Sequence, residues 1–65
     1  MQDHELPELM TVVQLAQFLQ VPVATIYQWR HRGEAPRGLR IGRYVRFRRS
    51  DVERWLQLQA DAQAS

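Results

Sequence analysis

Pro22 divides the first half of the chain into two short helical patterns, and this division constrains the fold more than any other feature of the sequence. Proline has no backbone N–H and disfavours helical geometry in the residue before it, so a helix cannot run through Val21 into Pro22. Proline is nevertheless well placed at the start of a helix. The chain must therefore end one helix before Pro22 and can begin another at once.

The segment before Pro22 has the pattern of a capped helix. Thr11 and Gln14 have the spacing of a capping box, with threonine at the N-cap and glutamine three residues later, and Met10 and Leu15 occupy the flanking staple positions. The apolar residues that share one helical face are Val12, Leu15, Ala16 and Leu19. This pattern predicts a helix from residue 12 to about residue 19.

The second helical pattern starts at residue 22 or 23 and continues to about residue 31. Ile26 and Trp29 are neighbours on one helical face and are expected to point inward. Gly33 is placed to end the helix in a left-handed conformation. Because only about three residues separate the two helices, they are expected to cross steeply, as in a helix-turn-helix.

Residues 34–38 predict a loop, and two stretches that alternate apolar residues with arginine follow it. The alternating positions are Leu39, Arg40 and Ile41 in the first stretch and Val45, Arg46 and Phe47 in the second. A period of two is typical of β-strands, so the pair predicts a hairpin.

The length of the hairpin loop decides which side chains share a face, because a one-residue register change moves every side chain of a strand to the other face. A two-residue loop of Gly42 and Arg43 mixes apolar and charged residues on one face. A three-residue loop that adds Tyr44 makes one face wholly apolar and sets Arg40 opposite Arg46 on the other. We expect the three-residue loop, with the opposed arginines, which repel each other, facing an anionic ligand.

A third helix is expected from Asp51 to about Leu58. Ser50 and Glu53 repeat the capping-box spacing, and Asp51 is favourable near a helix N-terminus. The residues expected to be buried are Val52, Trp55 and, in part, Leu56. The fold class is therefore mostly α with a small β-hairpin, a winged helix-turn-helix.

A chain of 65 residues is enough for one domain. We expect a flexible N-terminal arm over residues 1–8, the winged helix-turn-helix domain over residues 9–58, and a C-terminal tail over residues 59–65 that either extends the third helix or frays. The acidic N-terminus is not a signal peptide, and no apolar run approaches the roughly 20 residues of a membrane helix. A cytoplasmic protein without a membrane partner is expected.

Charge is strongly polarised along the chain. Residues 30–49 hold eight of the nine basic residues, all of them arginine, and a single acid, Glu34, whereas the rest of the chain has one arginine and six acids. Such a block implies an anionic partner. Nucleic acid is favoured over membrane headgroups, because no strongly amphipathic basic helix is evident; a merely solvated basic surface is the other alternative.

No catalytic constellation is evident, since the sequence has no nucleophile beside a base, no glycine-rich phosphate loop before a helix and no credible pair of carboxylates. We expect neither enzymatic activity nor a cofactor. The chain has no cysteine, which excludes a disulfide framework. His4 and His31 are far apart with no cluster of ligands around them, so no metal site is expected.

Two stretches carry a family resemblance: LMTVVQLAQFLQVPVATIYQWRHRG, residues 9–33, and RIGRYVRFRRSDVERWL, residues 40–56. They resemble the excisionase-type helix-turn-helix family, which is related to the winged DNA-binding domains of MerR-like regulators. The family commonly has glycine where Gln20 stands and serine where Pro22 stands. A left-handed glutamine at position 20 would cost about 1 kcal/mol relative to glycine.

The resemblance implies a recombination directionality factor that binds and bends double-stranded DNA and directs an integrase towards excision. The absence of a long dimerisation helix predicts a monomer that assembles with neighbouring copies of itself on DNA. A small transcription regulator of the same family is the alternative, and an adaptor whose basic ribbon binds an acidic protein is a third possibility.

In helix-turn-helix proteins the second helix enters the major groove, with its N-terminal residues nearest the bases. Gln28 could form a bidentate contact with adenine, and Thr25 could donate a hydrogen bond to a base or a phosphate. Ala24 could contact a thymine methyl group. The predicted DNA contacts of the second helix are Ala24, Thr25, Tyr27, Gln28, Arg30, His31 and Arg32, of which the last three suit phosphate and Tyr27 is either a core residue or a phosphate contact. Those of the wing are Arg40, Gly42, Arg43, Tyr44 and Arg46, with Arg43 and Tyr44 reaching the minor groove.

Overall fold

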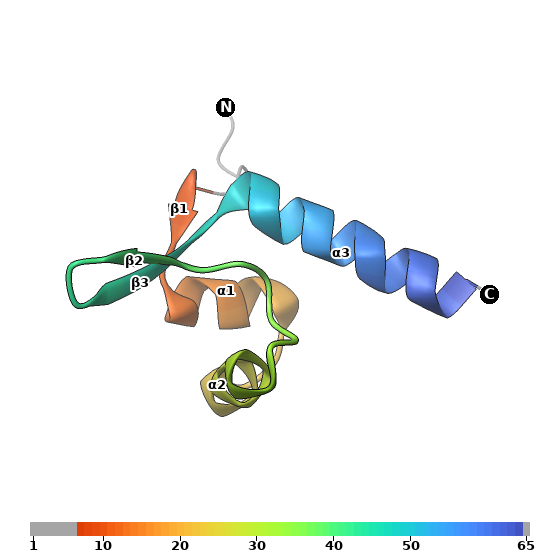
Figure 1. Cartoon of the computed structure of the whole chain (residues 1–65), viewed down its shortest axis with the longest axis horizontal. Coiled ribbons are helices and arrows are strands. Elements are labelled where there is room, and N and C mark those ends of the chain that lie inside the picture. The colour runs from red at the N-terminus through yellow and green to blue at the C-terminus, as the bar shows by residue number, and fades with distance from the viewer. Residues whose placement is uncertain (1–6, 65) are drawn as a thin grey trace.

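The computed structural model describes residues 7–64, so most of the expected N-terminal arm, including His4, lies outside the described residues. The elements are, in order, β1 (Leu9–Met10), α1 (Val12–Leu19), α2 (Val23–Arg32), β2 (Leu39–Ile41), β3 (Tyr44–Arg48) and α3 (Arg49–Ala64). Three helices and a small antiparallel sheet form a winged helix-turn-helix, as expected. The β2–β3 hairpin and α3 extend to opposite sides of the pair α1 and α2 (Figure 1).

The predicted capping box of α1 is confirmed. The Gln14 backbone N–H donates to Thr11 Oγ1 at 3.0 Å, and the Thr11 N–H donates to Gln14 Oε1 at 2.9 Å. Met10 and Leu15, the two staple residues, are completely buried. Helix α1 ends at Gln20, which has φ 60° and ψ 44° and is therefore left-handed.

Helix α2 follows directly, with Pro22 in an extended conformation at its N-cap and Gly33 at its C-cap. Gly33 has φ 73°, so the predicted left-handed helix end is confirmed. Ile26 is completely buried and Trp29 is half-buried, which turns this side of α2 towards the core.

Strand β1 was not predicted, and it makes the sheet three-stranded in the order β1-β3-β2. Met10 pairs with Phe47 and Leu9 with Arg48. The Arg49 N–H continues this pairing by donating to the Glu8 carbonyl at 3.0 Å. Strand β3 is thus paired along its whole length, with β2 over residues 44–46 and with β1 over Phe47 and Arg48.

The predicted three-residue hairpin loop is wrong. Ile41 pairs with Tyr44 and Arg40 with Val45, so the loop is Gly42 and Arg43. Gly42 has φ 62°, and glycine in this conformation at the first loop position is what a tight two-residue hairpin turn requires. Each face of the hairpin is therefore mixed, and the opposed pair of arginines does not exist.

The physical reason is that only the root of the wing is buried. Phe47 is completely buried and Val45 half-buried, but Ile41 and Tyr44 near the tip are 48% and 57% exposed. Where neither face is covered, burial does not select the register. The register is selected instead by the loop, because Gly42 readily adopts the positive φ that a two-residue turn needs.

The core draws on almost every element. Its buried side chains are Met10, Leu15, Ala16, Ile26, Phe47 and Val52. Trp29 and Trp55 pack against each other at its edge, with ring centroids 5.7 Å apart, and Trp55 Nε1 donates to the Glu34 carbonyl at 2.8 Å. These contacts fix α3 to the C-terminal end of α2.

The predicted start of α3 is also wrong, because the helix begins at Arg49 and Ser50 lies within its first turn rather than at a cap. Strand β3 leads into α3 without a loop. The Arg49 N–H already donates to the carbonyl of Glu8, the residue before β1, and Arg48 Nε donates to Asp51 Oδ2 at 2.9 Å. The serine cap is therefore not needed here.

Helix α3 continues to Ala64, well beyond the predicted end near Leu58. Alanine and glutamine, which dominate this segment, are good helix formers, and Gln57 Nε2 donates to Asp61 Oδ1 one turn later at 3.1 Å. Residues 57–63 are all exposed. The predicted end near Leu58 is therefore too early, and of the two alternatives for the tail the extension of the third helix is confirmed up to Ala64. Across residues 7–64, no helix combines the length and apolar character needed to cross a membrane.

Candidate nucleic-acid interface

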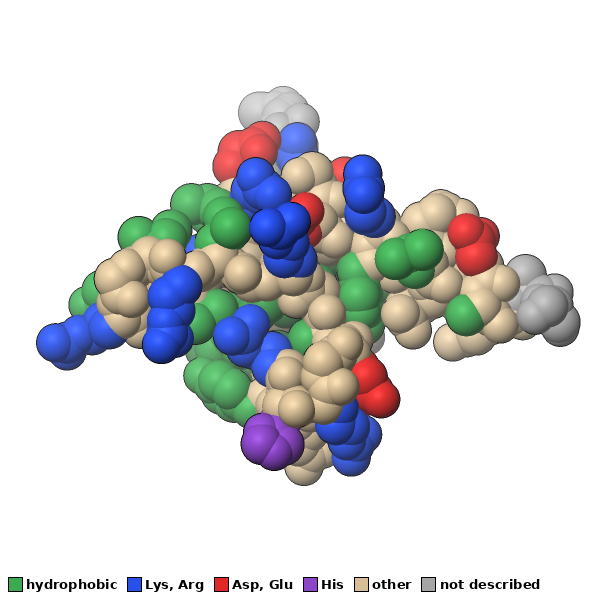
Figure 2. Space-filling view, viewed as in Figure 1, with side chains coloured by type: hydrophobic (Ala, Val, Ile, Leu, Met, Phe, Trp, Pro, Cys, Tyr) green, Lys and Arg blue, Asp and Glu red, His purple; other side chains and the backbone are tan. Residues whose placement is uncertain are grey.

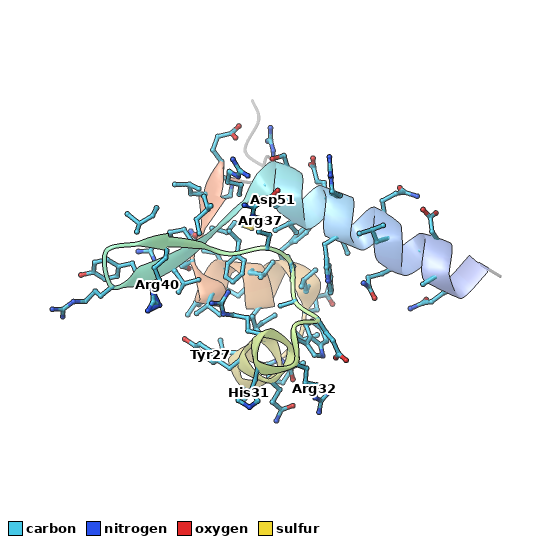
Figure 3. The ribbon with its side chains drawn as sticks, viewed as in Figure 1. Tyr27, His31, Arg32, Arg37, Arg40 and Asp51 are labelled. Carbon is cyan, nitrogen blue, oxygen red and sulfur yellow. The ribbon has the colours of Figure 1, made fainter. Side chains whose placement is uncertain are left out.

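The outer face of α2 carries most of the residues predicted to read DNA. Since Ile26 and Trp29 turn inward, the opposite stripe faces solvent, and Ala24, Gln28 and His31 on it are exposed. Tyr27 is 56% exposed, so of its two expected roles the core role is wrong. Figure 3 shows Tyr27 on the side of α2 towards the wing and His31 pointing away from the rest of the molecule.

Thr25 and Arg32, two other polar residues of α2, already have contacts within the protein. Thr25 is half-buried, and its backbone N–H donates to the Pro22 carbonyl at 3.0 Å. Arg32 Nη1 lies 3.7 Å from Glu34 Oε1, with both side chains about 60% exposed. An exposed ion pair of this kind contributes little and is easily exchanged for a phosphate.

The tip of the wing presents Arg43 and Tyr44 to solvent, as the sequence predicted. Arg46 is half-buried, with its Nη1 donating to the Val45 carbonyl at 2.9 Å and its Cζ 5.2 Å from the centre of the Tyr44 ring. Arg40 lies on the other face of the hairpin. Figure 3 shows its side chain directed towards α2.

A groove between α2 and the wing brings the two predicted sets of residues together. Its lining residues are Thr11, Val12, Tyr27, Arg30, Arg43, Tyr44, Val45, Arg46 and Phe47. Arg30 spans it from the α2 side, with its Cζ 5.7 Å from the centre of the Phe47 ring. The groove is therefore lined by cations and aromatic rings above an apolar floor.

The arginine block of the sequence does not form one surface. Arg30, Arg40, Arg43 and Arg46 lie at or beside the groove, and Figure 2 shows the blue side chains spread along the hairpin and around α2. Arg48 pairs with Asp51, and Arg49 contacts Glu8 and Glu53. Arg37 lies beside Asp51 at the start of α3, where both line a separate hollow (Figure 3).

Several residues that shape the groove were not predicted as part of a site. Thr11 and Val12 contribute to its lining from the start of α1, and Gly38 lies at the root of the wing beside Arg30, Val45 and Phe47. Nothing in the sequence marks Thr11 and Val12 as part of a groove, because the helix cap explains the threonine and the core explains the valine. Gly38 could have been noticed, since no predicted tight turn explains a glycine at this position.

Comparison with known proteins agrees with this geometry. Residues 9–59 match the model of a helix-turn-helix domain family, a DNA-binding family that includes excisionase-like proteins. The matched segment runs from β1 into α3 and contains the whole of α2, the wing and the groove. No curated protein matches the chain.

Proposed function

Because the chain belongs to the helix-turn-helix domain family, we propose that it binds double-stranded DNA in a sequence-specific manner, with α2 in the major groove and the wing at the adjacent minor groove. The observation that supports this best is the position of α2 and the wing on either side of one cationic groove. Gln28 and Ala24 contact bases, Arg40 and Arg46 contact phosphates, and Arg43 enters the minor groove. The protein acts through binding and has no catalytic chemistry of its own.

The finer proposal is that the protein is an excisionase. The sequence stretches 9–33 and 40–56 resemble that family, and the matched domain family includes excisionase-like members. Bending a site by 40–90° costs about 1–6 kcal/mol, and one small module has a footprint of roughly 600–1,000 Å². Several copies on neighbouring sites are therefore needed to bend DNA for an integrase.

Selection of preferred duplexes from a random pool, followed by mobility-shift titration, tests the first proposal. The expected result is a defined site bound far more tightly than random duplex at physiological salt. Equal, weak binding to all duplexes would contradict sequence specificity. Binding to an acidic protein without any preference for DNA would favour an adaptor.

A recombination assay tests the finer proposal. In an assay with a candidate integrase and a substrate carrying the selected site, the protein is expected to raise excision and lower integration. It is also expected to bend the DNA in a circular-permutation assay. If it binds its site but changes only transcription from a neighbouring promoter, the excisionase role is wrong and a regulator remains.

A further inference from the structure

Gly38 differs from the other two glycines of the chain. Gly33 and Gly42 have left-handed φ values of 73° and 62°, and a Cβ added at either would meet open space. Gly38 has a φ outside the left-handed region, yet a Cβ there would contact Arg30 Nη1 and would lie 3.2 Å from Val45 Cγ1 and 3.3 Å from Phe47 Cε1. Glycine at position 38 is thus explained by the close approach of its neighbours and not by its backbone conformation.

The nearest of these neighbours is the guanidinium of Arg30. It reaches from α2 to the root of the wing and is held between the Phe47 ring, 5.7 Å from its Cζ, and the backbone at Gly38. Phe47 is completely buried, so the surface beneath the guanidinium is fixed by the core.

The N–H groups of Arg30 have no carboxylate partner within residues 7–64. An arginine has five N–H donors in a planar fork that suits phosphate. Arg30 also lines the groove between α2 and the wing. Arg30 as a whole is exposed, but its guanidinium is restrained by the Phe47 ring and the backbone at Gly38. Its donors remain available at the junction of α2 and the wing.

We propose that Gly38 is a positioning residue for Arg30. The missing Cβ leaves the space in which the guanidinium lies, and from there Arg30 donates to the DNA phosphate located between the segment read by α2 and the segment held by the wing. The inference rests on the proposed DNA-binding function. It assigns to Gly38 an effect on affinity without any contact with DNA, because an ordered side chain loses less conformational entropy on binding.

Gly38→Ala tests this with little disturbance of the fold. The closest atom to the new methyl group is the end of a flexible side chain, and Val45 and Phe47 need to shift by only a few tenths of an ångström. Four proteins are compared: the parent chain, Gly38→Ala, Arg30→Ala and the double variant. The affinity of each for the selected duplex is measured over a series of salt concentrations.

Arg30→Ala is expected to lower the slope of log affinity against log salt by about one, the loss of one phosphate contact. Gly38→Ala is expected to weaken binding roughly two- to tenfold in the parent chain and to have no further effect in the Arg30→Ala background. Additive effects in the double variant would overturn the proposal. Arg54→Ala, which removes an exposed arginine of α3, is the control and should leave binding unchanged.

Thermal unfolding of the same four proteins gives a readout that does not depend on DNA. If Gly38→Ala lowers the melting temperature, it should do so less in the Arg30→Ala background, where the crowded side chain is absent. An equal loss in both backgrounds would assign the glycine to packing against Val45 and Phe47 and overturn the positioning role. Failure of the parent chain itself to prefer any duplex would instead contradict the proposed function.

Discussion

Gln20 holds the turn between α1 and α2 in a left-handed conformation, with φ 60°. Among residues 7–64 it is the one non-glycine residue with a positive φ. Such a conformation brings Cβ close to the backbone carbonyl and is normally left to glycine. The strain is located in the turn that sets the angle of α2, so it can be removed without altering any side chain of the groove.

Gln20→Gly is expected to stabilise the protein by about 1 kcal/mol, because relief of the left-handed strain exceeds the added entropy of the unfolded chain. Chemical unfolding followed by circular dichroism measures the change. The matched control is Gln17→Gly, an exposed position inside α1, where glycine should cost about 1 kcal/mol. Destabilisation by both substitutions would show that Gln20 is not strained.

Gln28 is the residue of α2 best placed to distinguish bases, because it is exposed in the middle of the outer stripe. Gln28→Ala should weaken binding to the preferred site by about 1–3 kcal/mol and leave binding to random duplex almost unchanged. Competition mobility shifts measure both affinities. An equal loss on the two duplexes would assign Gln28 to the phosphate backbone.

At the scale of elements, α1 and α2 were predictable because their signals are local. The capping box of Thr11 and the helix stop at Gly33 lie within a few residues of the ends they mark. Strand β1 has two residues, too few to show a period, and its existence depends on pairing with the distant β3. The predicted wing register is wrong because a wholly apolar face is favoured only where that face is buried, and the tip of the wing is covered on neither face.

The same distinction applies to the candidate site. The exposed stripe of α2 follows from helical period once Ile26 is assigned to the core, so its residues could be named from the sequence. The groove could not be predicted from the sequence, because Arg30, Val12 and Phe47 come together only when the root of the hairpin packs on α1 and α2. Ion pairs such as Arg48 with Asp51 likewise removed cations from a block that looked uniform along the chain.

The wing is expected to contribute mainly electrostatic affinity. Arg43→Ala at the exposed loop should weaken binding to all duplexes and lower the slope of log affinity against log salt by about one. Arg54→Ala removes the same charge from α3, outside the groove lining, and should leave the slope unchanged. If Arg43→Ala leaves the slope as in the parent chain, the wing tip does not contact DNA.

At the scale of the whole molecule, the exposed half of α3 is the surface that bears on oligomeric state. Its residues 57–63 are exposed, and Leu58 is its one large apolar side chain, 57% exposed. Stable interfaces bury more than about 1,000 Å² in total with an apolar centre. The segment is rich in glutamine and alanine and offers little apolar surface for the centre of such an interface.

We therefore expect a monomer in sedimentation at micromolar concentration and stepwise, cooperative complexes on a full DNA site, where neighbours are held at high effective concentration. Leu58→Gln should change neither result. A stable dimer in free solution that Leu58→Gln dissociates would show that α3 is a dimerisation helix and would favour a transcription regulator.

The direct passage from β3 into α3 has a mechanical consequence. Arg48 ends the strand and Arg49 begins the helix, and no flexible residue between them can absorb a change in backbone angles. Helix α3 is about 24 Å long, at 1.5 Å for each of its 16 residues. The helix is attached at two places, to the wing through β3 and to α2 through Trp55. A change in the angle between the wing and α2 would therefore load both attachments, and only the exposed segment 57–63 extends beyond them.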